Sequence, residues 1–386
     1  MFSSRVPGEL DPNRLTQAVR RARAAGRSLI DLTVTNPTHV GIDYPQGILA
    51  PLSGSPALSY DPHATGLPDA RAAVARDYVR HGISVAPDRV VLTASTSEAY
   101  SLLFKLLCAP AGDAVLVPVP SYPLFDHLTR LDGVGSISYR LEYHGRWAID
   151  FESLREAWDR NVRAVLAVSP NNPTGSIVTA DELRRLGQMC AAADAALIID
   201  EVFTDYPLAG HAARSNPALE CLTFRLGGLS KSAGLPQLKL GWIAVGGPDD
   251  MVRGAIERLD LICDTYLSVS TPVQVAAAAL IRGGGAIRAS ILSRIRENAS
   301  ALRRLASAYP SIEVLPCEAG WSIVLRVPST RSEEALVLEV LEEDGVLIHP
   351  GFFFDFQHEA FLVSSLLPEP PLFSEGMRRV LERAHV

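Results

Sequence analysis

The sequence predicts an α/β fold in which a mostly parallel sheet lies between helices, followed by a smaller α+β region. The chain has 386 residues, 47% of them hydrophobic, which is enough for a full-sized core in one or two domains. Across residues 89–200, short apolar runs alternate with helical patterns, as in parallel strands joined by helices. Residues 311–386 instead predict strands in pairs before each helix.

The N-terminal part predicts one helix, one strand and a long ordered loop. A helix is expected over residues 11–26, with Asp11 as its N-cap, Pro12 in its first turn and a glycine at its end. Residues 28–34 (SLIDLTV) predict a strand, and the prolines and glycine after it predict a loop. A second helix is expected over residues 68–82.

The central alternation places polar residues where strands end. Ligands of such sheets bind beyond the carboxyl ends of the strands. Ser95, Thr96 and Ser97 follow one predicted strand, Asn172 follows another, and Asp200 ends a third. The predicted elements are RVVLT (89–93), SEAYSLLFKLL (97–107), AVLVPVP (114–120), SISYRL (136–141), AVLAVSP (164–170), a helix over 179–193, and AALIID (195–200).

The apolar run LTFRL predicts a further buried strand, and it leads into GGLSKSAGLPQLKLGW at residues 227–242. The following strand is WIAVGG, and helices are expected at about 248–262, 271–282 and 284–309. We expect the glycines at 283–285 to break the chain and lead into a second lobe. That lobe contains predicted strands IEVLP, WSIVLRV, VLIHPG and FLVSSL, with two helices.

Charge and cysteine content exclude several classes of function. Lys and Arg total 36 against 43 Asp and Glu, so the net charge of −7 argues against broad binding of nucleic acid or anionic membrane. The five cysteines are widely spaced, without a CxxC pair, and are expected to be reduced core residues with no metal site. No apolar signal segment or membrane span is expected, so we predict a cytoplasmic protein.

Lys231 is the candidate nucleophile. A lysine that attacks a carbonyl group must be neutral part of the time, and desolvating surroundings lower its pKa. Taken alone, a solvated surface lysine is the commoner case. Two upstream segments change this interpretation: SPNNPTG at 169–175, and LIID at 197–200, which continues as EVF.

These three segments, in this order, resemble the pyridoxal-phosphate enzymes of the aspartate aminotransferase superfamily, classes I and II. The resemblance implies fold type I, with a mostly parallel seven-stranded sheet in a large domain over residues 46–282. The small domain would be discontinuous, formed by residues 1–45 and 283–386. The resemblance further implies a homodimer with pyridoxal 5'-phosphate held as a Schiff base on Lys231.

The resemblance also assigns contacts to the cofactor ring. Asp200 would hold the pyridinium nitrogen protonated, since a buried carboxylate needs a cation; the alternative is an aspartate that caps a turn. Asn172 would donate to the phenolic oxygen. Tyr122 would stack on the ring, or else simply pack there. Phe203 stands where the family has a tyrosine that also donates to the phenolic oxygen, so Asn172 would hold that oxygen alone.

The phosphate is expected at the start of a helix. Backbone N–H groups and the helix dipole at Ser95, Thr96 and Ser97 offer a seat for it, although an ordinary N-cap at Ser97 would need only one of them. Ser230 and Lys239 would complete the seat. Tyr60 would reach the phosphate of the other subunit, unless it packs at the base of its own loop.

Several residues depart from the family pattern. Lys239 replaces a phosphate-clamping arginine, Gly228 a phosphate-binding serine, and Thr96 a usual glycine. The largest departure is Val363 in FLVSSLLPE, where the family has the arginine that binds the substrate carboxylate. Arg326 is the nearest replacement in sequence, or else a surface residue.

The predicted activity is transfer of an amino group between an amino donor and a 2-oxo acid, with Lys231 as nucleophile and proton shuttle. Asn36, in a loop at the mouth of the site, Asn172 and Arg326 are expected to contact the substrate. Two alternatives stay open: another pyridoxal-phosphate reaction at Cα or Cβ, such as C–S lysis by β-elimination or decarboxylation, and a non-catalytic sensor that binds the cofactor. No helix-turn-helix precedes the domain, which speaks against the sensor.

Overall fold

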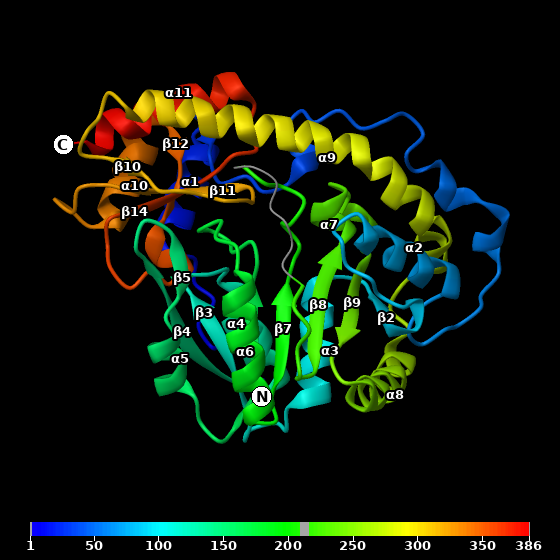
Figure 1. Cartoon of the computed structure of the whole chain (residues 1–386). Coiled ribbons are helices and arrows are strands. Elements are labelled where there is room, and N and C mark those ends of the chain that lie inside the picture. The colour runs from blue at the N-terminus through cyan, green and yellow to red at the C-terminus, as the bar shows by residue number, and fades with distance from the viewer. Residues whose placement is uncertain (1, 209–215, 386) are drawn as a thin grey trace.

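The computed structural model describes residues 2–208 and 216–385. Its largest feature is an eight-stranded sheet, which confirms the predicted α/β class (Figure 1). In spatial order the strands are β2 (Val90–Thr93), β9 (Gly241–Gly246), β8 (Thr223–Gly228), β7 (Ala196–Asp200), β6 (Val162–Val168), β3 (Ala114–Val119), β4 (Gly135–Tyr143) and β5 (Trp147–Ile149).

Strand direction brings the important strand ends to one edge of the sheet. β4, β3, β6, β7 and β8 are parallel neighbours, and Asp200 on β7 pairs with Val168 on β6 and with Leu226 on β8. β9 is antiparallel to both β8 and β2, so β2 runs in the same direction as β8. The eighth strand, β5, forms a short antiparallel pair with β4 and adds one strand to the seven predicted.

Side chains on each central strand alternate between two cores. On β7, Ile198 packs in the cluster formed with α3 (Thr96–Leu107), α4 (Leu124–Asp132) and α8 (Asp249–Tyr266). Its neighbours Leu197 and Ile199 pack in the cluster formed with α5 (Phe151–Ala157) and α6 (Ala180–Ala192). Because successive side chains of a strand point to opposite faces, helices cover both faces of the sheet.

The smaller domain is built around a four-stranded antiparallel sheet. Its order is β10 (Glu313–Val314), β11 (Ser322–Arg326), β14 (Phe361–Ser365) and β13 (His349–Pro350). The helix α10 (Glu333–Asp344) packs on β13, and α11 (Pro370–Ala384) packs on α10. The N-terminal segment joins this domain, since β1 (Ile30–Asp31) pairs with β12 (Val346–Leu347) and α1 (Arg14–Ala24) packs on α10.

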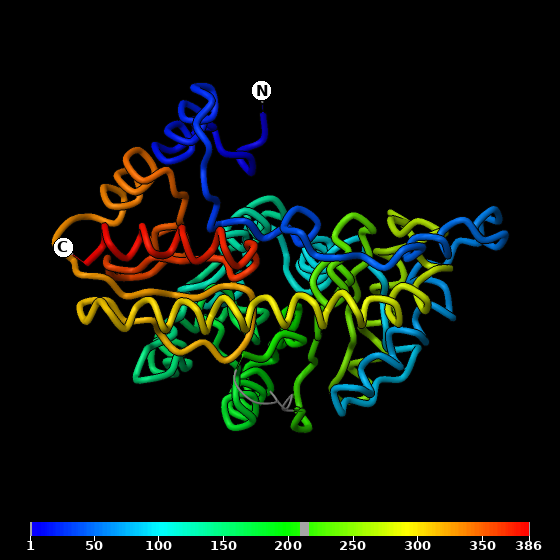
Figure 2. The backbone as a smooth tube through the Cα atoms, turned by 90° about the horizontal axis from the view of Figure 1, so that it is seen from above, coloured from blue at the N-terminus to red at the C-terminus, as the bar shows by residue number. Residues whose placement is uncertain are grey.

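The expected break at residues 283–285 is wrong, because α9 is one continuous helix from Thr271 to Ala306. It runs from α2 (Pro68–Val79) in the large domain to α11 in the small one (Figure 2). A Cβ at Gly283 would lie 2.5 Å from the side chain of Ile48, and one at Gly284 would lie 2.4 Å from Ala233 Cβ. These glycines therefore permit close helix packing rather than ending the helix.

Two further N-terminal predictions need correction. The N-cap of α1 is Asn13, whose side chain accepts a hydrogen bond from the Thr16 backbone, and not Asp11. The strand expected over residues 28–34 is only two residues long, because it pairs only with the two residues of β12. Local sequence suggested a longer strand than its partner can pair with.

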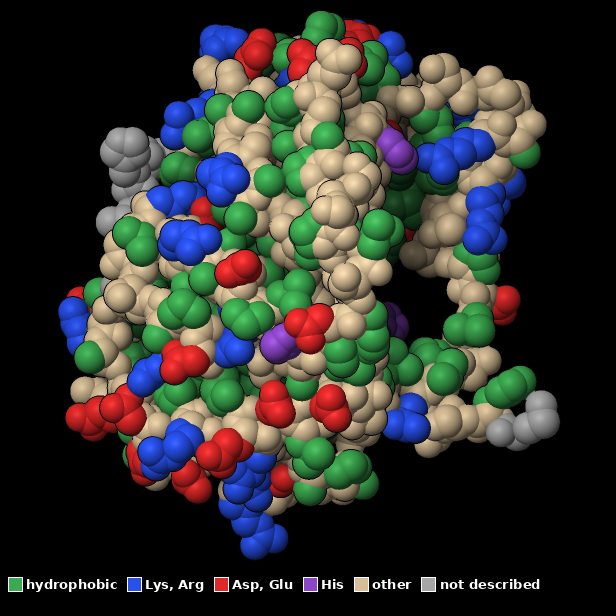
Figure 3. All heavy atoms as spheres, turned by 90° about the vertical axis from the view of Figure 1, so that its right-hand side faces the viewer, with side chains coloured by type: hydrophobic (Ala, Val, Ile, Leu, Met, Phe, Trp, Pro, Cys, Tyr) green, Lys and Arg blue, Asp and Glu red, His purple; other side chains and the backbone are tan. Residues whose placement is uncertain are grey.

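By length and composition alone, α9 could cross a membrane, and no other helix in residues 2–208 and 216–385 meets that test. Its apolar residues pack on α2 and α11 within the main core. All five cysteines are free and buried. Basic and acidic side chains both occur across the face shown in Figure 3.

Candidate functional site

Five sequence-predicted features follow strands that end at the same edge of the large sheet. The helix start at Ser95–Ser97 follows β2, Tyr122 follows β3, and Asn172 follows β6. Asp200 is the last residue of β7, and Lys231 lies three residues after β8. The topology therefore brings these segments to one edge, as the alternation of strands and helices predicted.

Lys231 lies in the short helix α7 (Leu229–Ser232), whose backbone is held from two sides. The Tyr206 hydroxyl donates to the carbonyl oxygen of Lys231, at 2.5 Å. From α9, Arg288 Nε donates to the carbonyl oxygen of Ser232, at 3.1 Å. Because both bonds use backbone carbonyls, they fix the position of α7 and leave the lysine side chain free to react.

The ammonium group of Lys231 faces aromatic rings. Its Nζ lies 4.9 Å from the centre of the Trp321 ring and 5.5 Å from that of Phe203. These two rings contact each other edge to face, and Tyr206 packs on Trp321 in the same way. Burial among such groups lowers the pKa of Lys231 to about 8, against an opposing effect of the Asp200 charge.

Asp200 is buried at the end of β7 and accepts two hydrogen bonds. The backbone N–H of Val202 donates to Oδ1 at 3.1 Å, and the Tyr100 hydroxyl donates to Oδ2 at 2.9 Å. Burial raises its pKa to about 6, although both hydrogen bonds and the Lys231 charge act in the opposite direction. Among the described residues, no lysine, arginine or histidine forms an ion pair with this carboxylate.

Asn172 lies in a turn whose shape depends on Gly175. This glycine has φ of +69°, and a Cβ on it would lie 2.1 Å from Cys317 Sγ and 2.6 Å from the Ala319 carbonyl oxygen. The turn thus packs directly on residues 317–319. The Ser322 hydroxyl donates to Asn172 Oδ1 at 3.0 Å, so the amide nitrogen Nδ2 remains available to a ligand.

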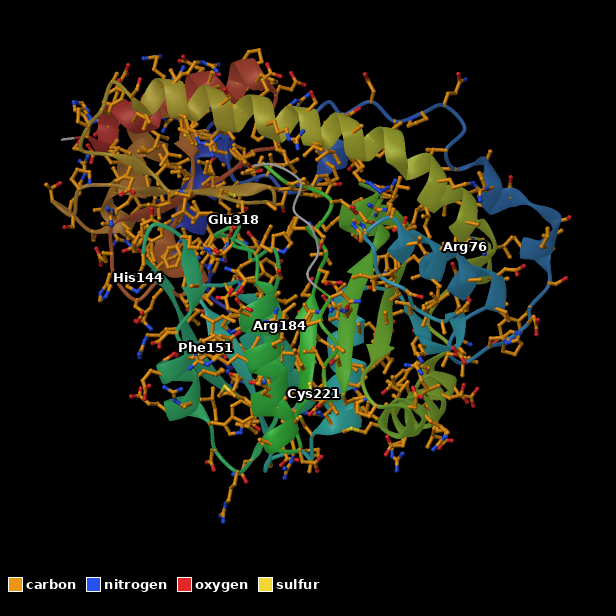
Figure 4. The ribbon with its side chains drawn as sticks, in the orientation of Figure 1. Arg76, His144, Phe151, Arg184, Cys221 and Glu318 are labelled. Atoms are coloured by element: carbon orange, nitrogen blue, oxygen red, sulfur yellow. The ribbon has the colours of Figure 1, made fainter. Side chains whose placement is uncertain are left out.

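Residues 317–320 lie between the asparagine turn and the segment after Asp200. Backbone N–H groups of Glu318 and Ala319 donate to the Gly175 carbonyl, at 3.2 and 3.0 Å. On the other side, the Gly320 N–H donates to the Tyr206 carbonyl at 2.9 Å. Figure 4 shows Glu318 where the small domain meets the large sheet. These bonds hold Trp321 against Lys231.

The predicted phosphate seat is the first turn of α3. Ser95 is its N-cap and accepts from the Glu98 N–H at 3.1 Å, while Thr96 and Ser97 stay partly exposed. A Cβ on Gly241 would lie 2.9 Å from the Ser95 carbonyl carbon, so the start of β9 packs on this turn. Lys239 precedes that contact by two residues, in a left-handed conformation and exposed.

Close packing explains why residue 228 is a glycine where the family has a serine. A Cβ there would lie 3.1 Å from both Gly241 Cα and the Leu240 carbonyl oxygen, closer than most side chains tolerate. Ser230, in α7, remains partly exposed, as expected of a side chain that could bind a ligand.

Three predicted residues lie at the periphery. The side chain of Tyr122 is 47% exposed and that of Tyr60 is 73% exposed. Asn36 caps the 3-10 turn η1 (Pro37–His39), with Oδ1 accepting from the N–H and hydroxyl of Thr38 at 3.0 and 2.7 Å. Its amide nitrogen donates no hydrogen bond within the described residues.

This arrangement agrees with comparisons to known proteins. A sequence profile described as aminotransferase class I and II matches residues 52–365. The chain belongs to this family. It is therefore an aminotransferase, an enzyme that catalyses transamination, as the sequence predicted.

Two curated relatives show how far the similarity extends. The glutamate-pyruvate aminotransferase AlaA of Haemophilus influenzae is 27% identical over 346 residues, covering 87% of this chain and 85% of the relative. The alanine aminotransferase of Mycobacterium tuberculosis is 26% identical over 385 residues, covering 95% of this chain and 87% of the relative.

Solved structures confirm the fold. An alanine aminotransferase from Pyrococcus furiosus superposes with a TM-score of 0.88 at 23% identity, and 99% of each chain is covered. A Thermus thermophilus aspartate aminotransferase double mutant superposes with a TM-score of 0.85 at 21% identity, again covering 99% of each chain. Fold type I was therefore correctly predicted.

In this aminotransferase, Val363 is buried (3% exposed) and packs with Trp147, Val324, Phe354 and other apolar residues. Its register partners are Val324 on β11 and His349 on β13, so these side chains share one face of the small sheet. Burial lowers the pKa of His349 and favours its neutral form. Val363, which stands where the family has its substrate-binding arginine, thus belongs to an apolar, uncharged surface.

Arg326 does not replace that arginine. It is exposed at the end of β11 and forms an ion pair with Glu313 on the neighbouring strand. Ser322, the residue of β11 that reaches Asn172, lies four residues away, about 13 Å along the strand. The structure therefore does not bring Arg326 to the other site residues, because its strand points it toward solvent.

Four residues of the aminotransferase site were not predicted from the sequence. Tyr100, Trp321, Ser322 and Tyr206 contact Asp200, Lys231 Nζ, Asn172 and the Lys231 backbone, respectively. Trp321 and Ser322 are far from the lysine in sequence. Tyr100, three residues after Ser97, and Tyr206, six residues after Asp200, lie close to segments that the sequence pointed to.

Proposed function

We propose that this aminotransferase works through pyridoxal 5'-phosphate bound covalently to Lys231. The observation that carries the proposal is a desolvated amine and a buried carboxylate at the same edge of the sheet. Lys231 is a desolvated amine and Asp200 a buried carboxylate, and neither has an ion-pair partner among the described residues. A buried carboxylate of this kind needs a cation to lower its cost.

The donor set suits this cofactor. Asp200 would face the ring nitrogen and Asn172 Nδ2 would donate to the phenolic oxygen. The first turn of α3, with Ser97 and Lys239 beside it, would hold the phosphate. When bound, pyridoxal 5'-phosphate supplies a protonated ring that withdraws electron density from the amine-bearing carbon of the substrate.

Lys231 would then serve two roles. As a neutral amine, Lys231 would hold the cofactor covalently, and once the amine of the substrate has taken its place, Lys231 would accept and release a proton at Nζ. A pKa of about 8 suits both tasks near neutral pH, because the group can both accept and release a proton there. Trp321 and Phe203 exclude water from one side of Nζ.

For the substrates, we infer an amino acid donor and a 2-oxo acid acceptor, with glutamate, alanine and pyruvate the first to test. Support comes from the names of the two curated relatives. Because the face around Val363 is uncharged, the α-carboxylate would be held by neutral donors such as Asn172 Nδ2. We therefore expect weak substrate binding, with high KM values.

We further propose a homodimer. Residues 43–66 project from the body of the chain (Figure 2) and carry Leu58, 89% exposed, and Tyr60. Apolar side chains on a projecting segment favour burial against another surface. A partner subunit would cover them and place Tyr60 near its phosphate seat.

The decisive experiment is borohydride reduction of the purified holoprotein, followed by peptide mapping. The chain contains only two other lysines, Lys105 and Lys239, so the labelled position is unambiguous. Label on Lys231 is expected, and label elsewhere would refute the proposal. Mixing the holoprotein with each amino donor should then convert the visible absorption band, and sedimentation over a dilution series should show a dimer in the active range.

A further inference from the structure

Tyr100 and Asp200 form a buried hydrogen bond between two elements of the site. The tyrosine hydroxyl on α3 lies 2.9 Å from Asp200 Oδ2 at the end of β7. The other carboxylate oxygen accepts from the Val202 N–H. Each oxygen of Asp200 is thus fixed by one donor, and each retains a lone pair for a ligand.

The tyrosine ring has little freedom to move. Tyr100 is 3% exposed, and its ring packs edge to face on Phe125, with ring centres 5.3 Å apart. Phe104, one turn further along α3, lies 6.1 Å from it. Burial raises the pKa of Tyr100 well above its usual value, so the phenol keeps its proton and acts as the donor.

The helix that carries Tyr100 also begins at the proposed phosphate seat. Ser97 and Tyr100 are three residues apart, so they lie on the same side of α3, about 4.5 Å apart along its axis. One rigid helix would therefore fix the phosphate end of the cofactor and, through Asp200, its ring nitrogen.

Three titratable groups act on Asp200 from the elements around it. They are Tyr100 from α3, Lys231 from α7, and Glu201, which follows Asp200 in sequence. Glu201 is itself paired with the buried Arg225. Tyr100 is the member of this set that donates a hydrogen bond to the carboxylate.

We propose that Tyr100 is a positioning residue of this aminotransferase, which holds Asp200 in its charged form so that the shared proton stays on the ring nitrogen of the cofactor. The inference rests on the proposed function. Only one proton is involved, and it can reside on the nitrogen or on the carboxylate. A hydrogen bond to the carboxylate favours the charged pair, and its loss favours the neutral acid beside an unprotonated ring.

The test uses the holoenzyme loaded with pyridoxal 5'-phosphate labelled with 15N in the ring. The chemical shift of this nitrogen distinguishes the protonated ring from the unprotonated ring. Four proteins are compared: the parent, Tyr100→Phe, Asp200→Asn as the reference for an unprotonated ring, and Tyr139→Phe as the matched control. Tyr139 is equally buried, but its hydroxyl donates to the Leu166 carbonyl.

We expect a protonated ring in the parent and in Tyr139→Phe, and a shift toward the Asp200→Asn value in Tyr100→Phe. The kcat of Tyr100→Phe should fall about tenfold, as one pKa unit implies, with little change in KM. If Tyr100→Phe gave the parent 15N shift, the proposal would be overturned.

Two further outcomes keep the inference separate from the proposed function. If the cofactor does not attach to Lys231 in the parent, the proposed function fails first. If it attaches but the 15N shift of the ring nitrogen is the same in the parent and in Tyr100→Phe, only the role of Tyr100 is refuted. Tyr100→Leu also lacks the hydroxyl and should give the same 15N shift, which provides a second variant for the test.

Discussion

The Ser322 hydroxyl lies 3.0 Å from Asn172 Oδ1, and this hydrogen bond joins the small domain to the asparagine turn of the large one. Ser322 is the first residue of β11, and its predecessor Trp321 faces Lys231. One strand end therefore orients an amide and covers the reactive amine. Through Ser322 and Trp321, the position of the small domain therefore affects Asn172 and Lys231 at the edge of the large sheet.

Removing the Ser322 hydroxyl should allow the side chain of Asn172 to rotate. In Ser322→Ala, the amide can turn over and present its oxygen, instead of its nitrogen, to the phenolic oxygen of the cofactor. We expect the dissociation constant of pyridoxal 5'-phosphate to rise about fivefold, the value of one neutral hydrogen bond of about 1 kcal/mol. Absorbance titration of the apoprotein measures it.

Ser364→Ala is the matched control, because the Ser364 hydroxyl donates to the backbone carbonyls of Ser365, at 3.0 Å, and Leu32, at 3.5 Å, and not to Asn172. It should bind the cofactor like the parent. Equal binding by both serine variants would show that Ser322 does not orient the amide.

The lowered pKa of Lys231 should appear in the stability of the apoprotein. The lysine has a pKa of about 8 when folded against 10.5 ordinarily, so the unfolded chain binds more protons between these values. The free energy of unfolding should therefore rise with pH from 8 to 10.5, by about 3 kcal/mol at most.

Lys231→Met lacks this titration. It should be more stable than the parent apoprotein at pH 7, and the difference should shrink toward pH 10.5. Urea unfolding at several pH values measures both proteins. A constant difference across this range would mean that Lys231 is not desolvated.

Lys239 supplies a test of the phosphate seat. If it faces the phosphate, Lys239→Ala loses one charge-assisted hydrogen bond, of about 1.5 kcal/mol for a group as exposed as this one. The dissociation constant of pyridoxal 5'-phosphate should then rise about tenfold, and Lys239→Arg should restore binding. Lys105→Ala is the control, since Lys105 pairs with Asp132 at the far end of α3. Unchanged binding in Lys239→Ala would place this lysine away from the phosphate.

Sequence alone predicted the large sheet and the residues at its strand ends because both depend on local patterns. Apolar runs that end in Asp200 or lead to Asn172 and Lys231 fix where those side chains go, since parallel strands share one edge. The fold and the position of the nucleophile follow from such runs.

Contacts between distant segments could not be found in this way. Tyr100 reaches Asp200 across 100 residues, and Ser322 reaches Asn172 across 150. Neither residue type is unusual in its own element, so only tertiary packing reveals the contact. Arg326 is the opposite case: it is close to the expected arginine position in sequence, but its place at the end of β11 gives it Glu313 as a partner.

Arg326→Ala should accordingly leave substrate binding unchanged. The ion pair with Glu313 is exposed, and such pairs contribute little to stability. We expect the KM for the 2-oxo acid and for the amino donor to change less than twofold, as measured by steady-state kinetics. Glu313→Gln, which removes the other half of the pair, should behave in the same way. A tenfold rise in KM in Arg326→Ala alone would return this arginine to the site.

The glycines of α9 provide the last prediction, because adjacent positions should respond in opposite directions. In Gly284→Ala the new Cβ would lie 2.4 Å from Ala233 Cβ and 3.1 Å from Ala233 Cα, so α9 or the end of α7 must move. This should destabilise the protein by about 1–3 kcal/mol and weaken cofactor binding, since Ala233 follows Lys231 by two residues. In Gly285→Ala the Cβ meets no atom within 4 Å, and alanine should stabilise the helix by about 0.5–1 kcal/mol. Denaturant unfolding of both variants measures the two effects. Equal stabilities would mean that α9 does not pack as closely on α7 as these glycines allow.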